Sequence, residues 1–317
     1  MASSITTTLV ADVGGTNTRV GLASGGALVR GSVRRFPNEA HTGLDDVLSA
    51  FVAEHSETVI DAAAVAVAGP VGDGTGELTN RAWAFDTEML RTVTDAKHTV
   101  ILNDLQAQGY ALAHLDPTSC RHICGPAAGS GTKLVVGVGT GFNVAVVYTT
   151  KNGRFVPPAE AGHAGLPVRT EAELRLGQFL ESAHGYASVE DAMSGRGIER
   201  LYSWASNELG KPGTLDASSV IAAHVDGNDP AASLAVEKFV TLFGAECGNL
   251  ALNYLPVGGL YIIGGAARAM SAHFDEFGFE KAFCDKGRFS EYMQRFPVLI
   301  VEDDYAALNG LATYFED

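Results

Sequence analysis

The sequence is short of cysteines, basic residues and long apolar runs, and each shortage excludes a class of protein. Its 22 basic residues against 37 acidic ones give a net charge of −15, which disfavours a nucleic-acid partner or an anionic membrane surface. No apolar run is long enough for a membrane span, and the first residues, MASSITTT, lack the charged and apolar regions of a signal peptide. We therefore expect a cytoplasmic protein.

Cysteine usage points to the same compartment. The four cysteines form no CxxC pair and stand at no zinc-ligand spacing from a histidine. We expect them to be buried free thiols in a reducing compartment: Cys120, Cys124, Cys247 and Cys284.

What the sequence does contain is enough apolar material for a large core. It has 317 residues, of which 46% are hydrophobic and 19% charged, as in an ordinary globular protein. This length predicts one large or two medium domains.

One pattern occurs twice along the chain. Residues 9–23 read LVADVGGTNTRVGLA and residues 134–148 read LVVGVGTGFNVAVVY, and in each a glycine-rich turn separates two β-branched runs. This pattern predicts a β-hairpin whose tip presents backbone N–H groups with no Cβ in the way. Such a tip can cradle phosphate oxygens, and two of them could grip one polyphosphate from opposite sides.

The order of elements also repeats. The first half predicts three antiparallel strands in residues 6–36, a helix near 44–52 capped by Thr42, and buried strands at 62–69 and 98–104. The second half predicts a hairpin at 134–148, a third strand near 155–158, a helical block over 170–254 with a helix starting at Asp229–Pro230, strands at 259–267 and 298–304, and a final helix over 305–315.

Ten motifs, in order along nearly the whole chain, identify a family. They are DVGGTNTR (12–19), AGP with LTNRAWAF (68–70, 78–85), ILND (101–104), GVGTGFN (137–143), PAEAGH (158–163), SVEDAMSG (188–195), NLALN (249–253), IIGGAA (262–267), FCDKGRF (283–289) and ALNGLA (307–312). With them the chain resembles the bacterial glucokinases. It does not resemble the zinc-containing repressor-type sugar kinases, because no cysteine cluster follows His163.

The resemblance implies an α/β fold of the duplicated ribonuclease H-like (actin-like ATPase) type, with two domains around a central cleft. We expect residues 1–106 with 302–317 to form the small domain and 107–301 the large one. The implied activity is ATP-dependent phosphorylation of D-glucose to glucose 6-phosphate with Mg²⁺, in a homodimer.

Asp104 is the candidate general base. It ends an apolar strand, where a carboxylate can accept the proton of a primary alcohol, although an Asp there is equally typical of a helix cap. The resemblance favours the catalytic role over the cap.

The resemblance also implies a sugar-binding group, because sugar hydroxyls need paired donors and acceptors. Taken alone, His163 is typical of a core histidine, Asn80 of a turn, and Glu190 of a capping box with Ser188. The implied sugar ligands are Asn80, Asn103, Asp104, Glu160, His163 and Glu190.

The resemblance implies that the nucleotide is bound by the two glycine turns and by a third glycine pair, Gly264 and Gly265. Taken alone, glycines at such positions are also typical of ordinary turns. Asp12 would face Mg²⁺ through water, or stabilise its own turn, and Arg19 would reach a phosphate or form a surface ion pair. The other candidates are Gly14, Gly15, Thr16, Asn17, Gly139, Thr140, Gly141, Gly264 and Gly265.

Three positions depart from the family pattern. Ala159 and Ala161 stand where the family usually has glycine, and so does Asn143, a residue type that tolerates left-handed backbone. These departures leave the hexose open, so a kinase for mannose, fructose or an amino sugar is the nearest alternative. An actin-like ATPase or a phosphatase of the same fold, or an ADP or polyphosphate donor, are the others.

Overall fold

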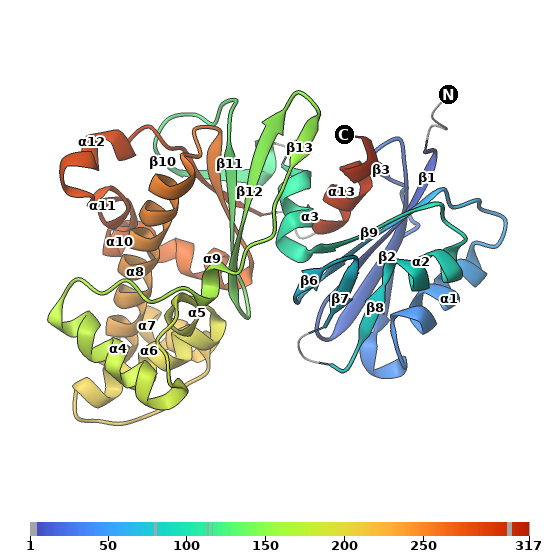
Figure 1. The fold of residues 1–317 in the computed structure, drawn as a ribbon. Helices are drawn as coiled ribbons and strands as arrows, with labels where there is room; N and C mark the ends of the chain where they lie inside the picture. The colour runs from blue at the N-terminus through green and yellow to red at the C-terminus, as the bar shows by residue number, and fades with distance from the viewer. Residues whose placement is uncertain (1–4, 79–80, 113, 116, 303–305, 317) are drawn as a thin grey trace. The chain divides into compact units, whose positions relative to one another are not determined.

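The computed structural model describes residues 5–78, 81–112, 114–115, 117–302 and 306–316. The chain divides into two compact units, Met1–Pro117 with Val147–Pro158 and Asp303–Asp317, and Thr118–Val146 with Ala159–Glu302. Each is described by itself (Figure 1). No helix among the described residues is both long and apolar enough to cross a membrane.

The first unit is built on a sheet whose strands run in the order β3-β2-β1-β5-β9, with β4 paired to β2. β1 and β2 form the predicted antiparallel hairpin, while β5 lies parallel to β1 and β9 parallel to β5. The strands are β1 (Thr7–Val13), β2 (Asn17–Ser24), β3 (Ala27–Leu28), β4 (Arg34–Pro37), β5 (Ala62–Val67) and β9 (His98–Asn103).

Helices and a small sheet complete this unit. They are α1 (Leu44–Glu54), α2 (Thr87–Thr94), α3 (Asp104–Ala111), α13 (Ala306–Thr313) and the strands β6 (Val71–Gly72), β7 (Thr75–Glu77) and β8 (Ala84–Asp86). In Figure 1, α13 lies beside α3. Glycine allows this close approach, since a Cβ on Gly310 would lie 1.7 Å from the Ala107 oxygen.

Two local predictions in this unit are wrong. The predicted third strand is split into β3 and β4, because Gly31 turns the chain with a φ of +78° between them. Helix α1 is capped by Gly43 rather than by Thr42; Thr42 instead donates its backbone N–H to Asp46.

The second large sheet repeats the topology of the first. Its order is β10-β15-β14-β11-β12-β13, and β14 lies parallel to β11 and β15 parallel to β14, as β5 does to β1 and β9 to β5. The strands are β10 (Cys120–Cys124), β11 (Lys133–Val138), β12 (Phe142–Thr150), β13 (Gly153–Phe155), β14 (Gly259–Ile263) and β15 (Val298–Val301). The predicted duplication is confirmed, although β13 begins two residues and ends three residues before the predicted strand.

The end of β12 and β13 belong to the first unit, where they pack on α3. Gln106 donates to the Val156 oxygen at 2.8 Å, and a Cβ on Gly109 would lie 2.9 Å from the Val156 side chain. The two units thus differ from the predicted domain limits, which remain a prediction.

The helical block of the second unit covers the predicted residues. Asp229 caps α8 with Pro230 at the first helical position, as predicted, and Gly244 and Gly248 of α8 let α11 pack closely. The helices are α4 (Glu171–His184), α5 (Val189–Ala192), α6 (Gly195–Glu208), α7 (Ala217–Val225), α8 (Pro230–Tyr254), α9 (Gly265–Met270), α10 (Phe274–Phe277), α11 (Phe279–Cys284) and α12 (Ser290–Met293).

None of the four cysteines forms a disulfide, in keeping with the predicted thiols. Cys124 and Cys247 are buried, and burial raises the pKa of Cys124 to about 12. Cys120 and Cys284 are only half-buried, which differs from the prediction.

Candidate active site

The first glycine turn, residues 14–16, joins β1 to β2. The Gly14 N–H donates to the Asn17 oxygen at 3.0 Å, which closes the turn. Gly14 is not among the glycines with positive φ, so the turn needs glycine for space rather than for a left-handed backbone. The N–H of Gly15 has no hydrogen-bond partner in the described residues, and it is available to an oxygen ligand.

Asn38 holds this turn, and the sequence analysis missed it. Its side chain is fully buried, donates to the Gly14 oxygen at 2.7 Å and accepts from the Thr18 hydroxyl at 2.8 Å. Its backbone N–H donates to the Thr16 oxygen at 2.9 Å. An Asn after a strand in a predicted loop carries no signal of this role, because its partners are at least 20 residues away in sequence.

Asp12 lies next to the first turn, in β1. Burial raises the pKa of its carboxyl, while the Arg19 guanidinium, 3.7 Å away across the hairpin, lowers it. Arg19 therefore makes the ion pair that was the alternative to a phosphate contact. A carboxylate that is costly to bury and is paired with Arg19 at the long distance of 3.7 Å suits a site where a divalent cation completes the charge balance.

The second glycine turn, residues 139–141, joins β11 to β12 and is also closed by a hydrogen bond from its first glycine, although one residue closer in sequence. The Gly139 N–H donates to the Gly141 oxygen at 3.0 Å, and the Gly139 oxygen accepts from the N–H of Gly195, at the start of α6, at 2.8 Å. Open space surrounds the Cβ position of Gly139. In the part of the chain that the structure describes, the Thr140 N–H has no partner, which parallels Gly15.

Glu190 supports the second turn. One carboxylate oxygen accepts from the Phe142 N–H at 2.9 Å, and the other accepts from Arg196 at 3.0 Å. A Cβ on Gly141 would lie 2.5 Å from this carboxylate, so any other residue there would displace the Glu190 side chain. The capping-box alternative for Glu190 is wrong: Ser188 caps α5, and its partner in the box is Asp191.

Asn143 joins the second hairpin to the PAEAGH segment. Its amide donates to the Ala159 oxygen at 2.6 Å and lies 3.4 Å from the Glu160 carboxylate, and its oxygen accepts from the Ala161 N–H at 3.1 Å. Asn143 does not have a positive φ, so left-handed backbone is not the reason for Asn here.

The side chains of the PAEAGH segment separate into two kinds. Ala159 and Ala161 pack against the core of the second unit, whereas Glu160 and His163 are exposed. The core alternative for His163 is therefore wrong. An exposed acceptor and an exposed imidazole held on the short 3₁₀ turn Ala161–His163 are available to bind a polar ligand.

Asn103 and Asp104 stand at the junction of β9 and α3. Asn103 caps the helix with Gln106 in a reciprocal capping box and donates to the Gly69 oxygen at 3.3 Å. The cap is thus Asn103 and not Asp104, which corrects the capping alternative. Asp104 is the first helical residue; it is half-buried, and one of its oxygens accepts from the Leu105 N–H at 2.8 Å.

Gly264 and Gly265 connect β14 to α9. Gly264 has a φ of +101°, and a Cβ there would lie 2.3 Å from the Val138 oxygen, so backbone geometry requires glycine. Open space surrounds the Cβ position of Gly265, the first residue of α9.

The predicted site residues fall in both units. Asp12, the first turn, Asn103 and Asp104 lie in the first unit, and the second turn, Glu160, His163, Glu190, Gly264 and Gly265 lie in the second. Within the second unit, Glu190 contacts the second turn directly. Asn80 lies outside the described residues.

Comparisons with known proteins point in one direction. A family model described as Glucokinase matches residues 9–317. The glucokinase of Marinobacter nauticus is 30% identical over 306 residues, covering 96% of this chain and 95% of the relative. That of Nitrobacter hamburgensis is 32% identical over 307 residues, with the same coverage.

A solved structure agrees. The crystal structure of a glucokinase from an Antarctic psychrotroph superposes with a TM-score of 0.88 at 29% identity. The match covers 98% of this chain and 99% of that one.

Proposed function

This chain belongs to the glucokinase family and phosphorylates D-glucose with ATP, and we propose that Asp104 is the general base of the reaction. In this proposal Asp104 takes the proton of the primary hydroxyl while that oxygen attacks the γ-phosphorus and ADP leaves. The observation that carries the assignment is the place of Asp104: it follows β9 directly as the half-buried first residue of α3, while Asn103 and Gln106 form the capping box of that helix.

The proposed nucleotide site consists of the two glycine turns with Gly264 and Gly265. The N–H groups of Gly15 and Thr140 would bind phosphate oxygens, since both lack partners among the described residues. The open space at Gly139 and Gly265 would allow close approach of ATP to the backbone.

Asp12 would hold Mg²⁺ through water. The residue fits this ion because Mg²⁺ prefers oxygen ligands, keeps several waters and uses few protein carboxylates. The bound ion would neutralise phosphate charge as it develops. The chain itself supplies the Asp12 carboxylate. Burial raises the pKa of this group, and the nearby Arg19 guanidinium lowers it.

The proposed sugar ligands are Asn80, Asn103, Asp104, Glu160, His163 and Glu190. The Asn143 amide contacts the Glu160 carboxylate and so positions it. A glycine at position 143 would leave the backbone freer but could not make this contact. Glu190 also accepts from the Phe142 N–H, next to the second glycine turn. A sugar hydroxyl bound at Glu190 would therefore be linked to this turn through a single side chain. We also propose that the enzyme is a cytoplasmic homodimer.

The decisive experiment pairs two isosteric variants. Asp104→Asn keeps an oxygen for the Leu105 N–H, so α3 should start normally, but it removes the base; kcat should fall by about 10²–10⁴-fold while calorimetric glucose affinity changes little. Glu160→Gln is the matched control and should weaken glucose binding with kcat much less affected. Near-normal turnover of Asp104→Asn would refute the assignment.

Substrate choice needs a separate assay. ATP consumption is measured without sugar and with glucose, mannose, fructose or an N-acetyl sugar. Glucose should give the highest kcat/KM. Consumption that no sugar stimulates would instead indicate an actin-like ATPase, and a preference for another sugar would indicate a different hexose kinase.

A further inference from the structure

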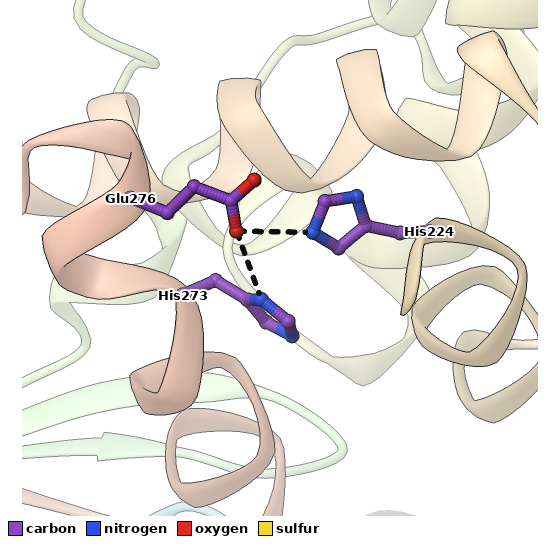
Figure 2. A group of neighbouring side chains, drawn as sticks. All are labelled: His224, His273 and Glu276. Carbon is purple, nitrogen blue, oxygen red and sulfur yellow. Dashed lines mark hydrogen bonds and ion pairs between the residues drawn. The ribbon is translucent and has the colours of Figure 1, made fainter. Parts of the chain in front are cut away.

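Two histidines and a glutamate meet in the second unit, and none of them is among the site residues assigned above. His224 lies on α7, His273 ends the 3₁₀ turn Ser271–His273, and Glu276 lies on α10 (Figure 2). Both α7 and α10 pack against α8. The three side chains therefore come from separate elements and converge on one point.

The distances between these side chains fit metal ligands better than hydrogen-bond partners. His224 Nε2 lies 3.4 Å and His273 Nδ1 lies 3.5 Å from the same Glu276 oxygen, and the three ligand atoms all lie within 4.8 Å of one another. Good N–H···O bonds are shorter, about 2.7–3.2 Å. Metal–ligand distances of about 2.0–2.1 Å in a tetrahedron give ligand–ligand edges of about 3.3 Å.

Burial and a supporting contact strengthen this view. The side chains of His224 and His273 are only 9% and 11% exposed, and their rings meet edge-on with centroids 4.7 Å apart. Ser233 Oγ lies 3.1 Å from His224 Nδ1. A proton on Nδ1 donated to this oxygen leaves the Nε2 lone pair directed at the Glu276 side, the arrangement that orients a ligating histidine.

We propose that His224, His273 and Glu276 bind a transition-metal cation, Zn²⁺ in the first instance, with water in the fourth position. Two imidazole nitrogens and one carboxylate suit Zn²⁺, whereas Mg²⁺ prefers oxygen ligands alone. The Glu276 side chain is 53% exposed, which gives the ion a path from solvent. The bound ion ties α7 to α10 and stabilises the second unit.

The test uses the full-length protein after chelator treatment, in buffer without Mg²⁺. Calorimetry should give one Zn²⁺ per chain, and Tm should rise by roughly 5–10 °C at a free Zn²⁺ concentration of about 100 times Kd. Mg²⁺ at the same concentration should not produce this shift. Ser233→Ala should weaken Zn²⁺ binding by roughly 10–100-fold through loss of ring orientation.

Glu276→Gln is the variant that decides the matter. It changes an exposed residue, so its Tm without metal should match the wild type, and its high-affinity Zn²⁺ binding should be lost. His41→Gln removes a histidine from another His–carboxylate pair, with Asp46 at 3.1 Å, and should bind Zn²⁺ normally. Cys284→Ser should also bind normally, which separates this site from the half-buried thiol.

Two results would overturn the proposal. One is a wild-type Tm and calorimetric trace that Zn²⁺ leaves unchanged. The other is equal Zn²⁺ stoichiometry and affinity in the wild type and Glu276→Gln, which would assign the binding to other residues.

Discussion

Each glycine turn is closed by a hydrogen bond from the N–H of its first glycine, but the side chains that support the two turns differ in kind. The first is held by Asn38, an uncharged amide that is fully buried. The second is held by Glu190, a carboxylate that is 19% exposed and paired with the more exposed Arg196. The comparison shows that a repeated backbone pattern can be retained while the side chains that fix it differ in charge and burial.

The difference has a functional consequence. Asn38 has its polar groups satisfied within the first unit, so it can only fix the turn. Glu190 is a proposed sugar ligand as well as a support, so under the proposed function the second turn is the one that can respond to the sugar.

Asn38→Ala should give the largest stability loss and so tests the first half of this comparison. It removes the partner of the half-buried Gly14 oxygen and of the buried Thr18 hydroxyl, which should cost about 2–3 kcal/mol of unfolding free energy. Urea denaturation measures the loss. Asn143→Ala is the control beside the second turn; it is half-buried and should cost about 1 kcal/mol. Equal losses of unfolding free energy in the two variants would contradict the special role of the buried Asn38 side chain.

The glycines of the second turn provide a matched pair with a smaller expected effect. Gly141→Ala places a Cβ against the Glu190 carboxylate and should cost about 1–3 kcal/mol, with a raised KM for glucose. Gly139→Ala meets open space and should change stability by less than about 0.5 kcal/mol, yet raise the KM for ATP. Thermal unfolding and steady-state kinetics separate the two. An unchanged KM for ATP in Gly139→Ala would remove this turn from the phosphate site.

Asp12→Asn concerns the charge beside the first turn and should have the smallest effect on stability. Burial raises the pKa of Asp12 in the folded protein. The stabilisation that protonated Asp12 gives the fold is therefore fully present below the pKa of an unfolded Asp, about 3.9, and is lost as pH rises through the pKa of the folded protein. Relative to wild type, the variant should gain Tm as pH rises through this window and keep the gain at pH 7.

Asp61→Asn is the control of opposite sign for this pH series. Backbone N–H groups of Thr6 and Thr7 lower the pKa of Asp61, so its stabilisation is present above the unfolded pKa and is lost as pH falls. Its Asn variant should therefore lose Tm at pH 7. The same direction of change in both variants would contradict the assignment of Asp12 as the costly charge.

Much of the fold could be predicted from local patterns. Alternating β-branched runs around glycine predicted β1–β2 and β11–β12, and the Asp–Pro pair predicted the start of α8. Capping residues were harder to predict than the elements themselves. The cap of α3 is Asn103 rather than Asp104, and the capping-box partner in α5 is Asp191 rather than Glu190. A shift of one residue in the start of a helix is enough to change which residue caps it.

The sequence suggested which residues form the candidate site, and this membership stays a prediction, but it did not suggest which residues support them. Motif order picked out Glu160, Glu190 and the glycine turns, yet gave no sign of Asn38 or of the cluster of His224, His273 and Glu276. Asn38 is distant in sequence from the turn that it holds, and His224 is distant from His273 and Glu276, so only packing brings these groups together.

The sequence by itself determined the duplicated strand–turn–strand pattern, the family and the reaction, because these depend on residue type and short spacing. The tertiary structure alone decided which groups are buried, which N–H and carboxylate groups already have partners, and which glycines are required by neighbouring atoms. Those properties depend on contacts between segments far apart in the chain, and no local pattern encodes them.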